Sequence, residues 1–399
     1  MSTFDFIKLN DVAESRIFIV GSANGSGNLG DEGMFESLAA FVDIQYPEIK
    51  ISTDAIALDY EPPTKNVDRI IPFYGSVGSS KVRRIIELWC LKNLPKLGLA
   101  LVRVSKDKSD LYSYYLQLKE SDTLIFSGAG AINSVFRGYG IYGWASIAYL
   151  SKALGVKYYL TGHGIGPFTS DFDQRTALDF IKNAEKVKVR DKISENFLIK
   201  NNVRNCFSDM DDATFIPKLS EDATRVAFER LNITAKKYYV VSLHEWKKGN
   251  ENEKFVGNVV KLVQEMINHE LIVVLLGNKT KGKMNDIPYL KAIKRKYFSE
   301  NDSVKVVDFK YNALFSKTLV SNSLCLFTTR YHPAIFTYED KVPVVCFAFD
   351  NYYYQKFSGA LMYREDKENI KLINISDIEN SLSDIKNKFI VQSCNGNIC

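Results

Sequence analysis

An arginine and a histidine stand two residues apart in the segment TTRYHPAIF, where Arg330 and His332 follow the apolar run LCLF. In an extended segment, alternate side chains point the same way, so the pattern predicts that both residues face one side. A permanently charged guanidinium beside a titratable imidazole suits an anionic substrate that must also receive a proton. A purely structural role for both residues is the alternative that spacing alone leaves open.

Three further polar residues follow apolar runs elsewhere in the chain. His163 lies among glycines in YYLTGHGIGPF, Arg190 ends the run VKVR, and His244 lies in SLHEW. An imidazole can donate a hydrogen bond to a phosphate or carboxylate, and an arginine grips either anion with its planar fork. The alternatives are structural histidines and, for Arg190, a salt bridge to Asp191 or to a neighbouring helix.

Two glycine-rich stretches follow apolar runs, GSANGSGNLGDEGMF at residues 21–35 and SGAGAIN at residues 127–133. The first leads into a predicted helix that begins near Asp31 and Glu32, where unpaired amides favour an anion. It lacks both the GxGxxG spacing and the Walker lysine, so neither a dinucleotide nor a nucleoside triphosphate is indicated. Two acids that stabilise the positive end of the helix dipole, and a tight turn in SGAGAIN, are the structural alternatives.

These segments require strands that end at a common edge. Short apolar runs alternate with stretches of helical spacing, which predicts parallel sheets covered by helices. The predicted strands are 16–21, 50–53, 123–128, 157–162 and 187–190, and then 238–243, 271–277, 304–309, 324–328 and 343–347. We expect an α/β protein of two Rossmann-like domains, 1–216 and 217–399, whose sheets face an interdomain cleft lined by the carboxyl ends of the strands.

Length and composition agree with this organisation. The chain has 399 residues and a formal charge of +5, which predicts two domains and does not indicate a nucleic-acid partner. Its six cysteines show no CxxC pair and no zinc spacing, so we expect reduced thiols and no metal. The N-terminus has no signal-peptide pattern and no apolar run is long enough for a spanning helix, so we expect a cytoplasmic protein.

Seven segments in order resemble the polysaccharide pyruvyl transferase family over residues 18–361. They are NLGDE, SGAGAIN, GHGIGP, VRDKISENFL, DMDDATF, RYHPAIF and PVVCFAFDNYYYQKFSGAL. The resemblance implies a GT-B-like fold and transfer of the enolpyruvyl unit of phosphoenolpyruvate onto a sugar, as a cyclic ketal within a surface polysaccharide or its lipid-linked precursor. Phosphoenolpyruvate is then a co-substrate, and no other cofactor is expected. We expect the acceptor side in 1–216 and the main donor side in 217–399.

The resemblance also implies roles for single residues. Arg190, Arg330 and His332 match donor-binding positions of the family, and we predict His332 as the general acid. The family more often has glutamine at His163, which leaves open whether this histidine donates a proton or replaces an amide hydrogen bond. The resemblance does not fix the general base, for which Asp31 and Glu32 are the nearest carboxylates that the sequence offers. The remaining predicted contacts are Gly164 and His244, with His163, for the donor, and Asn28, Gly30, Gly128, Gly130 and Asn133 for the acceptor.

One basic, apolar segment stands outside these motifs. Residues 81–106, KVRRIIELWCLKNLPKLGLALVRVSK, contain a single acid, Glu87, and Pro95 makes one continuous helix doubtful. The segment suits peripheral contact with an anionic membrane that carries a lipid-diphosphate-linked acceptor. A flap over a sugar phosphate and a solvated helix face are the alternatives.

Two rival functions remain at the level of the sequence. A GT-B glycosyltransferase that uses a nucleotide sugar has the same architecture, because one fold serves several chemistries. It would need a nucleotide pocket, whereas Arg330 and His332 favour a small dianionic donor. A non-catalytic protein that binds polysaccharide or assembles a complex is the other alternative, and it has less reason to keep both arginines and His332.

Overall fold

The computed structural model describes residues 3–9, 15–62, 64–246 and 249–391. The chain divides into two compact units, described separately below. Unit 1 comprises Met1–Ser26 and Asp31–Asp212, and unit 2 comprises Gly27–Gly30 and Ala213–Cys399. The division falls four residues before the expected boundary at 216. The short segment Gly27–Gly30, which includes the first two residues of α1, belongs with unit 2 because its backbone pairs with the segment after β9.

Unit 1 contains a seven-stranded sheet in the order β3-β2-β1-β4-β5-β6-β7. All neighbouring strands are parallel. Their bounds are β1 (Arg16–Asn24), β2 (Lys50–Ala55), β3 (Val67–Pro72), β4 (Thr123–Phe126), β5 (Lys157–His163), β6 (Lys186–Val189) and β7 (Cys206–Ser208). The strand order reverses between β1 and β4, which is where ligands bind in open parallel sheets.

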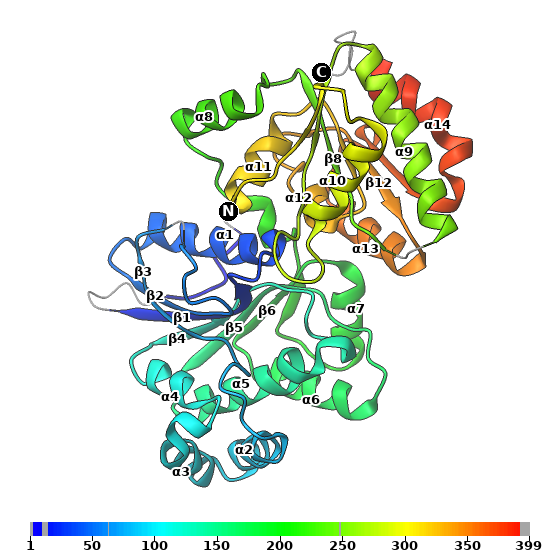
Figure 1. Cartoon of the computed structure of the whole chain (residues 1–399). Coiled ribbons are helices and arrows are strands. Elements are labelled where there is room, and N and C mark those ends of the chain that lie inside the picture. Colours follow the sequence, from blue (N-terminus) through cyan, green and yellow to red (C-terminus); the bar gives the residue numbers. More distant parts are fainter. Residues whose placement is uncertain (1–2, 10–14, 63, 247–248, 392–399) are drawn as a thin grey trace. The chain divides into compact units, whose positions relative to one another are not determined.

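Helices cover both faces of this sheet. Successive residues of β1 point to opposite sides and are apolar, so both faces must be covered. Phe18 and Val20 enter one apolar core, and Ile17 and Ile19 enter the other. Figure 1 shows α1 on one face and α5 and α6 on the other. The helices of this unit are α1 (Leu29–Gln45), α2 (Lys81–Asn93), α3 (Pro95–Ser105), α4 (Tyr112–Leu118), α5 (Trp144–Ala153), α6 (Asp171–Lys182) and α7 (Lys192–Lys200).

The segment 81–106 forms the helical hairpin α2–α3, which packs on α5 as an outer layer. The break expected at Pro95 is confirmed: α2 ends at Asn93 and α3 begins at Pro95. Proline is favoured at the first helical position, where its missing N–H costs no hydrogen bond. Gly98 lets the two helices approach closely, because a Cβ atom there would lie 2.7 Å from the backbone nitrogen of Leu91.

Unit 2 contains a six-stranded parallel sheet in the order β10-β9-β8-β11-β12-β13. Its strands are β8 (Tyr238–Ser242), β9 (Ile272–Leu275), β10 (Val304–Val306), β11 (Leu326–Thr328), β12 (Val344–Ala348) and β13 (Ile370–Asn374). Its helices are α8 (Glu221–Leu231), α9 (Asn250–Asn268), α10 (Asp286–Tyr297), α11 (Ala313–Ser321), α12 (Tyr331–Ile335), α13 (Asn351–Leu361) and α14 (Ile378–Lys386). Two Rossmann-like parallel sheets are therefore present, as predicted.

Candidate active site

Arg330 lies directly beyond β11 and is held by a carboxylate. Its Nε donates to Oδ2 of Asp286 at 3.0 Å, and its Nη2 pairs with Oδ1 of the same carboxylate. Oδ2 of Asp286 also accepts from the backbone N–H groups of Asn278 and Lys279, at 3.0 and 2.9 Å. Two parallel bonds between guanidinium and carboxylate fix the plane of the arginine. Asp286 therefore orients Arg330, whose side chain stays 22% exposed.

His332 is in the first turn of α12 and is buried, with 7% of its surface exposed. The expectation that residues 330–332 are all extended is wrong, because Arg330 is the extended N-cap residue and the helix begins at Tyr331. Gly30 lies against the imidazole, since a Cβ atom at Gly30 would lie 1.8 Å from Nδ1 of His332. Gly30, predicted as an acceptor contact, thus makes room for the predicted general acid.

The segment Gly27–Gly30, at the start of α1, belongs to unit 2 through backbone pairing. Leu29 donates its N–H to the carbonyl of Asn278 at 3.1 Å, and Thr280 donates to the carbonyl of Gly27 at 2.8 Å. Asn28, another predicted acceptor residue, forms an antiparallel bridge with Lys279. The segment 278–280 follows β9, as Arg330 follows β11, so the segment Gly27–Gly30 meets the carboxyl edge of the sheet.

His244 follows β8 and is buried beside Arg330. Its backbone N–H donates to the Thr329 hydroxyl at 3.0 Å, Nδ1 lies 2.8 Å from that hydroxyl, and Nε2 lies 3.4 Å from the Tyr353 hydroxyl. Burial first, and then the charges of Arg330 and Lys356, hold the pKa of His244 well below its ordinary value. The imidazole is therefore neutral near pH 7, and two cations lie within electrostatic reach of it.

Unit 1 contains a second site with a buried arginine, to which several separate motifs contribute residues. Arg190 follows β6, is buried, and donates from Nη1 to Oδ2 of Asp211 at 3.2 Å. A Cβ atom at Gly130 would lie 3.0 Å from Nη2 of Arg190, and one at Gly164 would lie 3.1 Å from it. The absence of side chains at these two glycines therefore leaves space for the guanidinium. Arg190 is paired with Asp211 rather than with Asp191, whose carboxylate caps α7.

His163 is fully buried at the end of β5. Its Nε2 lies 3.2 Å from the carbonyl oxygen of Phe126, and its Nδ1 lies 3.4 Å from that of Ala129. Burial lowers the pKa of His163 to about 4, so the ring is neutral near pH 7. A neutral imidazole that faces backbone carbonyls supports the loop after β4, as a glutamine amide would.

Gly128 and Asn133 lie in that same loop and shape it. A Cβ atom at Gly128 would lie 2.1 Å from Cε of Met34 and 2.9 Å from the carbonyl oxygen of Thr161. Asn133 donates to the carbonyl of Gly130 at 2.7 Å, and its Oδ1 accepts from Val135 and Phe136 at 2.8 and 3.1 Å. Both residues fix the backbone around Gly130.

The two predicted base candidates lie in the first turn of α1 and have different environments. Asp31 is half-buried and Glu32 is buried. One turn later, Glu36 is also buried and accepts from the Tyr60 hydroxyl at 3.2 Å. Burial first, and then the charge of Glu32, raise the pKa of Glu36 to about 8. A helix face with two buried carboxyl groups therefore holds a proton near neutral pH.

The raised pKa of Glu36 makes a testable prediction about stability. The ordinary pKa of a glutamate is lower, so the folded protein holds a proton that the unfolded chain releases, and stability falls as the pH rises toward 8. Between pH 5.5 and pH 8, the free energy of unfolding of the native chain should fall by about 3 kcal/mol more than that of Glu36→Gln. Denaturant unfolding at both pH values measures it, with exposed Glu48→Gln as the control. An equal pH dependence in Glu36→Gln and the native chain would contradict the assignment.

The described residues contain neither a metal-binding cluster nor a disulfide bond. No group of three His, Cys, Asp or Glu side chains there is arranged to hold a metal ion. Cys90, Cys206, Cys325 and Cys346 are free thiols. Cys394 and Cys399, for which we have no functional account, lie outside the described residues.

Comparison with known proteins decides the family. The family model described as polysaccharide pyruvyl transferase matches residues 28–351 of the chain. The chain belongs to the polysaccharide pyruvyl transferase family. All of the predicted site residues of this pyruvyl transferase family member, from Asn28 to His332, fall within the match. A search of curated proteins finds no match.

Solved structures confirm that this family member has the predicted GT-B-like fold. The S. aureus MnaA–UDP co-structure has a TM-score of 0.57 at 10% identity, over 95% of this chain and 90% of that one. UDP-GlcNAc 2-epimerase from Methanocaldococcus jannaschii has a TM-score of 0.55 at 12% identity, over 94% and 93% of the two chains. A putative UDP-N-acetylglucosamine 2-epimerase from Listeria monocytogenes gives 0.55 at 10% identity, over 96% and 91%. At these identities the likeness shows the fold alone.

Three residues near the predicted site of this family member were not predicted. Asp286 and Asp211 hold the two arginines, and Lys356 adds a second cation near His244. Asp211 lies in the motif DMDDATF and Lys356 in PVVCFAFDNYYYQKFSGAL. A search of these motifs for further charged residues would have found both. Asp286 lies in none of these motifs, and the residues around it in the sequence do not indicate its pairing with Arg330.

Proposed function

We propose that the protein transfers the enolpyruvyl unit of phosphoenolpyruvate to a sugar of a surface polysaccharide, free or lipid-diphosphate-linked, as a 4,6-linked cyclic ketal. The family match and the oriented Arg330 close to His332 in sequence and structure are the observations that support it. In this proposal the sugar that carries the ketal is part of a capsule or exopolysaccharide, or of its precursor. No cofactor takes part in the proposed reaction.

Arg330 is assigned to an anionic group of phosphoenolpyruvate. Two of its nitrogens bind Asp286, so the guanidinium plane is set before substrate arrives. Such preorganisation strengthens charge stabilisation, because no reorientation is needed during the reaction. Lys356, whose charge lowers the pKa of His244, is the cation that we assign to the second anionic group in unit 2. Arg190 in unit 1 remains a donor-binding prediction from the resemblance.

His332 is assigned as the acid that protonates the methylene carbon of phosphoenolpyruvate. Protonation leaves a cationic C2, which a sugar hydroxyl attacks with loss of its proton. The C2–O bond to phosphate then breaks, and a second hydroxyl of the same sugar attacks C2 and releases its own proton. One hydroxyl proton balances the proton gained by the methyl group, and the other leaves with phosphate.

Asp31 is our candidate for the base that removes a hydroxyl proton. It is half-buried and follows Gly30, whereas Glu32 is buried next to Glu36 and raises that residue's pKa. A base must reach a substrate proton as well as ionise, so the more accessible carboxylate is favoured. Glu32 remains the alternative. His163, Gly164, Gly128, Gly130 and Asn133 support the Arg190 site rather than contact the reacting atoms in this proposal.

Ligand-dependent thermal stability separates this proposal from the nucleotide-sugar alternative. A ligand that binds only the folded protein raises its Tm, and the rise grows with the logarithm of the ligand concentration above Kd. We expect phosphoenolpyruvate to raise the Tm in a concentration-dependent manner, with a smaller effect in Lys356→Ala and an unchanged effect in the exposed-lysine control Lys237→Ala. Stabilisation by UDP or a UDP-sugar without any effect of phosphoenolpyruvate would favour a nucleotide-sugar glycosyltransferase instead.

A further inference from the structure

The α2–α3 hairpin exposes an apolar stripe on one side of α2. Val82, Ile85, Ile86 and Trp89 are 67, 58, 48 and 57% exposed. Their spacing of three and four residues places them on one helix face. Cys90 and Leu91 are buried on the packed side of the helix, and Glu87 is buried between the two sides. The helix is therefore apolar on its solvent side as well as on its packed side.

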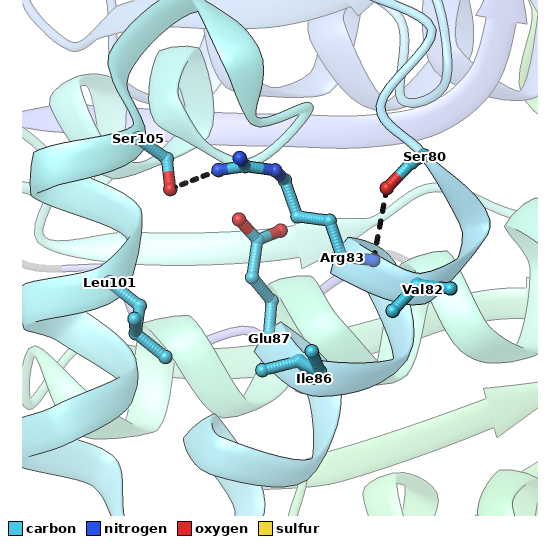
Figure 2. Close-up of a pocket in the computed structure, with 7 residues that line it drawn as sticks. All are labelled: Ser80, Val82, Arg83, Ile86, Glu87, Leu101 and Ser105. Carbon is cyan, nitrogen blue, oxygen red and sulfur yellow. Dashed lines mark hydrogen bonds between the residues drawn. The ribbon is translucent and has the colours of Figure 1, made fainter.

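The second helix of the hairpin continues this surface. On α3, Leu97 is 49% and Val104 is 81% exposed, with Leu101 on the same face. Figure 2 shows Val82 and Ile86 of α2 together with Leu101 of α3 around one shallow groove between the helices. Ser80, Arg83, Glu87 and Ser105 are its polar lining, where Arg83 donates to the Ser105 hydroxyl. The two apolar stripes thus form one continuous face.

Positive charge surrounds this apolar face. Residues 81–106 contain seven lysines and arginines and one acid, a formal charge of +6, whereas the whole chain carries +5. The one acid, Glu87, is buried. Arg84 pairs with Asp110 at 2.8 Å and Lys92 with Asp179 at 2.7 Å. The other exposed cations are Lys81, Lys96, Arg103 and Lys106.

We propose that the α2–α3 hairpin docks this protein on the surface of an anionic phospholipid bilayer. An amphipathic helix with exposed apolar residues and a basic border binds at the headgroup boundary, through apolar burial and attraction to anionic lipid. Trp89 is the residue type that favours this interface. Among the described residues no helix is both long and apolar enough to span a membrane, so the docking is peripheral.

A second copy of the chain is a poorer occupant of the same face. A symmetric contact would bring the same patch of each copy together. The two segments each carry +6, so their cations would repel across the interface. Phospholipid headgroups supply the negative charge that the hairpin itself lacks.

Vesicle flotation of the full chain, without phosphoenolpyruvate or acceptor, tests the docking. We expect binding to vesicles of phosphatidylglycerol and phosphatidylcholine, at least about tenfold weaker binding to pure phosphatidylcholine, and loss of binding at high salt. Equal binding to both vesicle types, or no binding to either, would overturn the proposal. Because no substrate is present, a failure here leaves the proposed transfer reaction untouched.

Paired variants separate apolar burial from charge. Ile85→Ser with Trp89→Ser, and separately Lys96→Glu with Arg103→Glu, should each weaken binding about tenfold or more. Lys200→Glu with Lys237→Glu makes the same change in net charge at exposed sites elsewhere and should bind like the native chain. An equal loss in that control would show that net charge, not the hairpin, drives binding. Dimerisation abolished by the apolar pair, with vesicle binding intact, would assign the face to a second copy.

Tryptophan fluorescence reports on the proposed anchor directly. Trp144 is buried, while Trp89 is 57% exposed in the hairpin. Anionic vesicles should shift the emission of the native chain to shorter wavelength, and Trp89→Phe should lose most of this shift while still floating with the vesicles. An unchanged shift in Trp89→Phe would contradict insertion of this side chain.

Discussion

Replacing Arg330 with alanine is expected to lower kcat/KM for phosphoenolpyruvate about a thousandfold. The guanidinium is oriented by Asp286 through Nε and Nη2, so alanine removes a preorganised charge rather than a mobile one. It also leaves Asp286 as a buried carboxylate without its cation, which repels an anionic donor. Steady-state kinetics of phosphate release, with the acceptor saturating, measure the loss.

Two further variants show whether orientation as well as charge matters. Arg295→Ala, an exposed arginine on α10, is the matched control and should retain native activity. Asp286→Asn keeps the arginine but weakens its clamp, and should lower kcat/KM less than Arg330→Ala does. The effects of Asp286→Asn and Arg330→Ala should not add in the double variant, because the two residues act as one unit. Native activity in a folded Arg330→Ala protein would remove Arg330 from the donor site.

Replacing His332 with glutamine is expected to lower kcat by a factor of about a hundred to ten thousand. Glutamine retains a hydrogen-bonding side chain of similar reach but cannot deliver a proton to the methylene carbon. The loss should therefore appear in kcat, with a smaller change in KM for phosphoenolpyruvate. The exposed His269→Gln is the matched control and should leave both parameters unchanged.

Gly30 offers an independent way to test the position of the His332 ring. An added methyl group would lie 1.8 Å from Nδ1, so Gly30→Ala should force the imidazole to move while its chemistry stays intact. We expect Gly30→Ala to lower kcat in the same direction as His332→Gln, with Tm measured to confirm folding. A folded His332→Gln protein with native kcat would exclude His332 as the acid.

Every interior strand was predictable from the sequence, whereas of the four edge strands only β10 was. All ten predicted strands are present, from β1 to β12. Nine of them lie inside a sheet, where strands covered on both faces read as continuous apolar runs, and the tenth is the edge strand β10. The three strands that were missed, β3, β7 and β13, each lie at an edge of a sheet. Their residues are mostly half-buried or exposed, so VDRIIP, CFS and IKLIN lack such a run.

The positions of the arginines and histidines beyond the strands were likewise predictable, because parallel strands end at one edge. Their environments were not. His163 faces carbonyls of another loop, and Arg330 meets a carboxylate 44 residues away in the chain. Gly30 joins unit 2 although it lies near the N-terminus. Such contacts depend on tertiary packing, which local spacing does not encode.

Identification of the product tests the proposed transfer from phosphoenolpyruvate to a sugar. Purified protein would be incubated with phosphoenolpyruvate and a panel of β-galactoside, glucoside, mannoside and N-acetylhexosamine acceptors, including lipid-diphosphate-linked forms, and acceptor mass would be followed alongside phosphate release. We expect one acceptor to gain the mass of pyruvic acid less one water, with one phosphate released per product, and both signals to disappear in Arg330→Ala. A mass gain of a whole sugar from a nucleotide sugar, with phosphoenolpyruvate left intact, would contradict the account.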